Sequence, residues 1–210
     1  MLLAGCGSSD DLPPAAGPDR SPPLEHAPAG QVIGESNGIG GEPVIEVLPA
    51  PATEALVHGG RKRAVVRPRE RVLEVYDAET GELLGSAPAG AGPTGVAAGE
   101  GGLAYVVDTA GDGLLVFETT GTVRIRRRYP LPGAPYGIAS DLRRSRLWVT
   151  LTARNELVEL ATSARPRRLA SYPTVRQPNA VTVDPQSGAV YVTGDGELQL
   201  LEPDRAAPSR

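Results

Sequence analysis

The residues of this chain that could contact a ligand are polar side chains set between short apolar segments. Two aspartates flank small residues in Asp108-Thr109-Ala110-Gly111-Asp112-Gly113, and carboxylate oxygens in such a loop can bind calcium. Their spacing differs from that of an EF-hand loop, and the same residue types favour a plain β-turn, so we predict no metal site here. The candidate ligand-binding residues are Asp108, Asp112, Tyr136, Thr152, Asn155 and Asp195.

The rest of the chain offers no catalytic constellation. His26 and His58 are the only histidines, and the sequence contains no Gly-x-Ser-x-Gly nucleophile motif, phosphate-binding loop or paired metal ligands. We therefore predict no catalytic residues, no metal and no cofactor, and a function other than catalysis.

Charge is distributed unevenly along the chain. The first 42 residues carry six acids and one base, a net charge of −5, so that the remainder carries +1 of the total of −4. Basic clusters can bind phosphates, but a nearly neutral body with few aromatic residues favours solvated strand edges instead. We predict no nucleic-acid binding by these three clusters: Arg61-Lys62-Arg63, Arg124-Ile125-Arg126-Arg127-Arg128 and Arg143-Arg144-Ser145-Arg146.

The amino terminus contains the only cysteine, Cys6, which excludes an intrachain disulfide. Leu3-Ala4-Gly5-Cys6 resembles the bacterial lipobox, in which the cysteine becomes the lipidated first residue of the mature protein. The resemblance implies a signal segment over residues 1–6, a lipid anchor on Cys6 and an extracytoplasmic location at the membrane. Residues 7–42 are rich in Pro, Ser and Gly and predict a disordered tether, and residues 204–210 predict a disordered tail.

Between these ends the chain repeats itself. Pro51, Pro93, Pro135 and Pro178 mark the starts of four copies, at spacings of 42, 42 and 43 residues. Each start precedes β-branched segments and polar turns, as in Pro135-Tyr136-Gly137-Ile138-Ala139 and the later Tyr191-Val192-Thr193. These segments resemble the YVTN β-propeller repeat family. The resemblance implies an all-β propeller over residues 43–203.

The number of predicted strands indicates how the propeller is completed. Each copy has room for four short strands, but the fourth ends after its third strand, Glu197–Leu201. An additional strand is predicted at Val44–Leu48, directly before the first copy, and could complete the last blade. We therefore predict four blades of four strands, closed by an N-terminal strand. An open arc, or a larger ring shared by two chains, is the alternative.

A propeller supports many unrelated functions, so its role depends on the site. We predict a lipid-anchored binding or scaffolding module of the cell envelope. A small molecule or protein partner would bind at the mouth of the channel, where the six candidate residues are expected. The alternatives are a lactonase-like or lyase-like hydrolytic propeller with a channel metal, and a degenerate fragment of a larger propeller.

Overall fold

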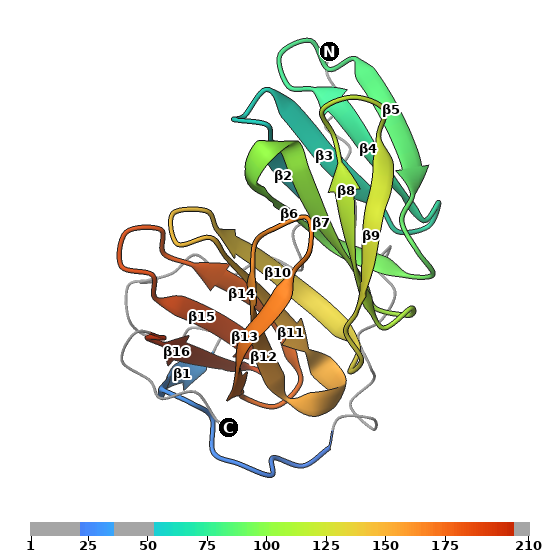
Figure 1. Ribbon diagram of the computed structural model, residues 1–210. Coiled ribbons are helices and arrows are strands. Elements are labelled where there is room, and N and C mark those ends of the chain that lie inside the picture. The colour runs from blue at the N-terminus through green and yellow to red at the C-terminus, as the bar shows by residue number, and fades with distance from the viewer. Residues whose placement is uncertain (1–21, 36–52, 204–210) are drawn as a thin grey trace, which may run out of the picture.

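The computed structural model describes residues 22–35 and 53–203, and within these ranges the regular secondary structure consists of β-strands and two short 3₁₀ helices, joined by turns. Sixteen strands form four antiparallel sheets of four strands, the blades of a propeller (Figure 1). The predicted fold class is confirmed. No helix in the described ranges is long and apolar enough to cross a membrane.

Blades one to three are each built from four consecutive strands. Blade one contains β2 (Glu54–Val57), β3 (Lys62–Arg67), β4 (Val72–Asp77) and β5 (Leu83–Pro88). Blade two contains β6 (Pro93–Ala98), β7 (Leu103–Asp108), β8 (Gly113–Glu118) and β9 (Arg124–Pro130). Blade three contains β10 (Pro135–Asp141), β11 (Arg146–Leu151), β12 (Glu156–Ala161) and β13 (Arg167–Pro173).

The fourth blade joins the two ends of the described chain. It contains β14 (Pro178–Val183), β15 (Val190–Gly194), β16 (Glu197–Leu201) and β1 (Gln31–Glu35). The two 3₁₀ helices are η3 (Glu100–Gly102), in the turn between β6 and β7, and η4 (Thr152–Arg154), in the turn between β11 and β12.

The repeated prolines set the start of the inner strands. β6, β10 and β14 begin at Pro93, Pro135 and Pro178, as the repeat predicts, whereas Pro51 lies outside the described residues. Proline has no N–H for a strand ladder and is tolerated at the first position of a strand. In all three strands the pairing register shifts directly after the proline. The proline therefore starts each inner strand with a local irregularity.

The blades pack face to face through three apolar layers. Phe117 lies in the layer between blades one and two, Tyr105 in that between blades two and three, and Trp148 in that between blades three and four. Burying a side chain of this size fully contributes roughly 2–3 kcal/mol. The inner strands follow one another in chain order, β2 beside β6, β6 beside β10 and β10 beside β14 (Figure 1). The described parts of β2 and β14 do not pack together to this extent, so the four described blades follow an open arc, which the sequence left as the alternative to a closed ring.

The face of blade one that is turned away from blade two is polar. Glu74 accepts hydrogen bonds from Tyr76 Oη at 2.6 Å and from Arg67 Nε at 2.8 Å. Arg63 lies over the Tyr76 ring, 5.4 Å from its centroid, and 3.7 Å from Glu54 Oε2. The hydrogen bond from Tyr76, followed by that from Arg67, lowers the pKa of Glu74.

The N-terminal strand completes the fourth blade, but from a different segment than predicted. β1 pairs antiparallel with β16, with Gln31 opposite Leu200 and Glu35 opposite Glu197. The predicted closing strand, Val44–Leu48, lies outside the described residues.

Residues 22–35 also correct the predicted tether over residues 7–42, because this part of it packs on the propeller. The Ala29 N–H donates to the Pro173 carbonyl at 2.9 Å, and Asn155 Nδ2 donates to the Pro22 carbonyl at 2.9 Å. Gln199 is 1 % exposed, and its Nε2 donates to the Ala29 carbonyl at 2.6 Å. The segment has few large apolar residues, and hydrogen bonds to its main chain help to secure it; such hydrogen bonds leave no hydrophobic pattern in the sequence.

Candidate functional site

The turns between the second and third strands of blades one to three share one geometry. The last residue of each of these turns has a left-handed φ of 48° to 57°, which Asp and Asn adopt more readily than most residues. Its carbonyl accepts the N–H of a residue entering the next blade: Ala89 donates to Arg71, Leu131 to Asp112 and Thr174 to Asn155. These hydrogen bonds connect each of the first three blades to its successor. The residues at this position are Arg71, Asp112 and Asn155, whereas Asp195, with φ of 47°, is the first residue of a shorter turn in blade four.

Two of the predicted site residues strengthen this connection with their side chains. Asp112 Oδ1 accepts hydrogen bonds from the Gly133 and Ala134 N–H groups, both at 3.0 Å. Asn155 Oδ1 accepts the Gln177 N–H at 2.7 Å. Both side chains thus receive main-chain amides from the segment that leads into the following blade.

Asp108 is a fully buried carboxylate with several donors. Its Oδ1 accepts the N–H groups of Ala91 at 2.9 Å, Gly92 at 2.8 Å and Gly111 at 3.1 Å. Its Oδ2 lies 2.8 Å from Arg128 Nη2. Buried charge is tolerated where it is paired and hydrogen-bonded in this way. The carboxylate therefore orders the entry to blade two.

Thr152, Tyr136 and Asp195 have different surroundings. Thr152 is buried, and its Oγ1 donates to the Ala134 carbonyl at 3.0 Å. Tyr136 is 8 % exposed, and burial raises the pKa of its hydroxyl. The Asp195 side chain is 54 % exposed and lies 3.8 Å from Arg176 Nη1.

The structure places most of the six candidates at one end of blades two and three, where the second strand meets the third and one blade leads into the next. Asp195 occupies the matching turn of blade four. Ligand binding by these residues stays a prediction, and their main observed contacts are within the fold. In residues 22–35 and 53–203 no group of three or more His, Cys, Asp or Glu side chains is placed to hold a metal ion.

The opposite end of the blades carries a hollow of about 430 Å³, which we name the A–B hollow after the turns between first and second strands. Blades one, two and three each contribute a turn to its wall. His58, Gly59 and Gly60 have φ of 54°, 67° and 82°. The lining residues are His58, Gly59, Arg61, Gly99, Glu100, Gly101, Gly102 and Leu142.

Sequence reasoning missed this hollow, although the repeat contains a signal for it. His58, Glu100 and Leu142 follow one another at intervals of 42 residues, which is the spacing of the repeat. They are therefore equivalent positions of three successive blades, and equivalent positions of a propeller face the same end. Interpreting the Arg61 cluster only as a solvated strand edge hid this relation.

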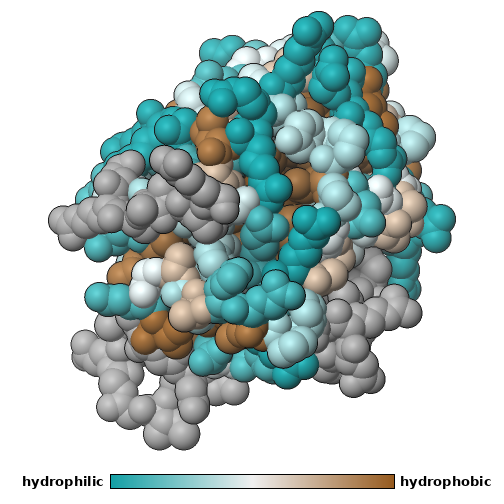
Figure 2. Space-filling model, turned by 60° about the horizontal axis from the view of Figure 1, so that its bottom comes forward, coloured by the Kyte–Doolittle hydropathy of each residue, from teal (hydrophilic) through white to brown (hydrophobic). Residues whose placement is uncertain are grey.

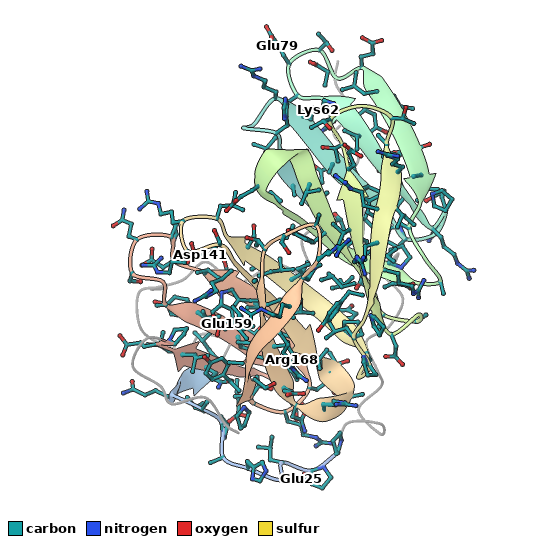
Figure 3. All side chains as sticks on the ribbon, in the orientation of Figure 1. Glu25, Lys62, Glu79, Asp141, Glu159 and Arg168 are labelled. Carbon is teal, nitrogen blue, oxygen red and sulfur yellow. The ribbon has the colours of Figure 1, made fainter. Side chains whose placement is uncertain are left out.

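The walls of the hollow come together at Gly102. A Cβ on Gly102 would collide with Thr120 Cγ2 and would lie 3.4 Å from His58 Nδ1. Next to it, Lys62 Nζ donates to the Thr119 carbonyl and, at 3.4 Å, to the Thr120 carbonyl. The turns of blades one and two are thus held against each other. Figure 3 shows Lys62 on the upper pair of blades and Asp141, next to Leu142, on the lower pair.

A second cavity, of about 370 Å³, lies between the N-terminal segment and blade three. Its lining residues are Pro22, Pro23, Leu24, Glu25, His26, Ala153, Arg154, Asn155, Glu156, Tyr172 and Pro173. The face drawn in Figure 2 is largely hydrophilic, with apolar residues in small separate patches.

No protein-family model and no curated protein matches the chain. Solved structures do match it. Hydrazine synthase of Kuenenia stuttgartiensis aligns with a TM-score of 0.64 at 16 % identity, over 82 % of this chain and 53 % of that one. A streptogramin B lyase aligns with a TM-score of 0.55 at 19 % identity, over 70 % and 49 %. A β-propeller domain from Myceliophteria thermophila aligns with a TM-score of 0.58 at 12 % identity, over 75 % and 58 %.

The chain thus spans about half the length of the structures it resembles. At these identities the similarity concerns the fold alone. Both the enzymes and the propeller domain share the architecture of this chain, which is that of a β-propeller of four-stranded blades.

Proposed function

We propose that this chain is a binding or scaffolding module of the bacterial cell envelope, held at the membrane by a lipid on Cys6, rather than an enzyme. The observation that supports this proposal is the use of Asp108, Asp112 and Asn155 as acceptors for main-chain amides. A catalytic base or a metal ligand needs an oxygen lone pair directed at a substrate or an ion. Here these oxygens are directed at the backbone that joins the blades.

The position of the N-terminal segment suits such an anchor. Pro22 contacts Asn155, and Figure 3 shows Glu25 at the lower edge of the molecule, below blade three. A lipid on Cys6 would be joined to the described fold through Pro22, which lies beside Asn155 at the end of blade three where the second and third strands meet. The A–B hollow lies at the other end of the strands and would be left open to ligands or partners.

Lipidation is tested by expressing the chain behind a full signal sequence and separating membrane from soluble fractions. Two or three acyl chains anchor a protein stably, whereas one anchors it only marginally. We expect the wild type and a Ser9→Ala control in the membrane fraction, and Cys6→Ser in the soluble fraction. An unchanged membrane share of Cys6→Ser would refute the anchor.

The hydrolytic alternative is tested with a panel of lactones and esters, assayed with calcium, magnesium or zinc and again with chelator. We expect no turnover above that of buffer. We also expect a thermal melt that chelator leaves nearly unchanged, because an ion bound to the folded state would raise its stability. Metal-dependent turnover that is lost in Asp112→Asn would establish an enzyme instead.

A further inference from the structure

The A–B hollow combines a cationic wall with an apolar one. Arg61 and His58 come from the same turn of blade one, and the structure gives neither side chain a hydrogen bond or ion pair with another described residue. Leu142, from blade three, is 44 % exposed. A volume of about 430 Å³ is in the range of pockets that bind small molecules.

Glu100 restricts the charge that the hollow can accept. Its Oε1 accepts a hydrogen bond from Ser145 Oγ at 2.7 Å, and the carboxylate lines the same hollow as Arg61. A ligand with two negative charges would be repelled by this carboxylate at short range. A single carboxylate matches the planar fork of an arginine, which donates two parallel hydrogen bonds to it.

Main-chain hydrogen bonds hold parts of the backbone around the hollow: the Gly60 N–H donates to the Val57 carbonyl at 3.2 Å, and the Thr119 N–H donates to the Gly102 carbonyl at 2.9 Å. Left-handed residues shape both walls, with φ of 67° at Gly59 and 61° at Gly101, and a Cβ at either glycine would meet no other atom within 4 Å. Small residues here keep the approach to the hollow open. A preformed hollow of this kind orders less chain on binding, which favours small ligands.

From these observations we infer that the A–B hollow is a binding site for a small organic monocarboxylate, with its carboxylate on Arg61 and its apolar part on Leu142. This inference rests on the proposed binding function and adds to it the class of ligand. His58 is the second donor on the same wall. Because the site is partly open to water, the expected dissociation constant is in the millimolar range.

The inference is tested by ¹H–¹⁵N NMR titration of the full soluble chain carrying Cys6→Ser. The probes are 4-methylpentanoate, 3-methylbutylamine, which has the opposite charge on a similar apolar group, and inorganic phosphate. We expect 4-methylpentanoate to shift the amides of Gly59, Gly101 and Leu142 in a saturable way. The amine should leave them unchanged, and phosphate should bind more weakly than the carboxylate.

Variants assign the effect to the hollow. Arg61→Gln should weaken 4-methylpentanoate binding by up to about fivefold, because an exposed ionic contact contributes up to that factor. Arg127→Gln removes an exposed positive charge from β9 and should have no effect. Glu100→Gln should strengthen phosphate binding relative to the wild type.

Three results would overturn the inference. They are shifts spread over the whole surface, equal binding in wild type and Arg61→Gln, and phosphate binding as tight as that of the carboxylate. None of these results bears on catalysis, because 4-methylpentanoate contains no bond for a hydrolase to cleave. The result of the turnover assay is therefore independent of the result of the titration.

Discussion

Gln199 is a buried amide that joins three parts of the molecule. From β16 its Nε2 donates to the carbonyls of Ala29, at 2.6 Å, and Pro173, at 3.1 Å, and its Oε1 accepts the Val175 N–H at 3.0 Å. These partners belong to the N-terminal segment, to the end of β13 and to the connection between blades three and four. We predict that Gln199→Met, which keeps the size of the side chain and removes its hydrogen bonds, destabilises the fold.

The size of this effect follows from which partners lose their contacts. The Pro173 carbonyl keeps the Ala29 N–H as a donor, whereas the Ala29 carbonyl and the Val175 N–H lose the hydrogen bonds from Gln199. Each unsatisfied buried group costs about 1–3 kcal/mol, and the added apolar burial of methionine offsets roughly 1 kcal/mol. The free energy of unfolding should fall by about 3 kcal/mol, which lowers the Tm of a domain of this length by roughly 6–12 °C.

Urea unfolding followed by tryptophan fluorescence measures this difference, since Trp148 packs in the layer between blades three and four. Gln186→Met is the matched control, because Gln186 is exposed in the turn between β14 and β15 and the same change there should stay within about 0.5 kcal/mol. Equal midpoints for Gln199→Met and wild type would refute the structural role of this amide and of the N-terminal segment that it secures.

Three further changes test other parts of the fold. Asp112→Ala should lower the free energy of unfolding by about 1 kcal/mol more than Asp195→Ala does, as measured by urea unfolding. Both residues have a left-handed φ, but only Asp112 accepts two amides from the segment that leads into the next blade. Equal losses of stability in the two variants would contradict this prediction. Gly102→Ala should lower the Tm more than Gly101→Ala does. Both glycines have a positive φ, so both variants carry backbone strain, but only the Cβ at position 102 would collide with a neighbouring side chain. This collision should cost about 2 kcal/mol in addition to the backbone strain. Hydrogen bonds from a tyrosine and an arginine lower the pKa of Glu74, so its contribution to stability is present above the unfolded pKa and is lost as pH falls. The free energy of unfolding should therefore decrease less between pH 6 and pH 3 in Glu74→Gln than in wild type, and parallel pH profiles would argue against this contribution.

The blades could be predicted because the sequence signals that specify their strands are local and repeated. Strand starts are marked by proline, and the third strand of blade one alternates apolar and polar residues in Leu73-Glu74-Val75-Tyr76. Each blade also packs mainly on its neighbours, so one repeat predicts the environment of the next. The location of the closing strand lacks this support, because the chain offers two short apolar segments upstream of the first repeat. In the structure the closing strand is Gln31–Glu35, directly after Ala29, which accepts a hydrogen bond from Gln199. In the sequence, nothing distinguishes Gln199 from an exposed polar residue.

The polar residues of the turns were recognisable from the sequence, but their partners were not. Asp112 and Asn155 bind amides about 20 residues further along, and the sequence alone does not show whether an aspartate in a turn faces a ligand or the next blade. The same limitation hid the A–B hollow, since its wall is formed by three turns that lie 42 residues apart in the chain. Such a site can be found in the sequence only by comparing the residues at equivalent positions of successive repeats.

The polar outer face of blade one constrains how another molecule could extend the arc. Apolar residues of β3 and β4 are buried against blade two, while Glu54, Arg63, Arg67, Glu74 and Tyr76 form hydrogen bonds and ion pairs on the opposite face. Terminal repeats of stacked proteins need such a face to remain soluble. A further blade packed here would remove these charges from water, at a cost that an apolar sheet could not offset. A partner at this end of the arc would therefore have to supply complementary charges.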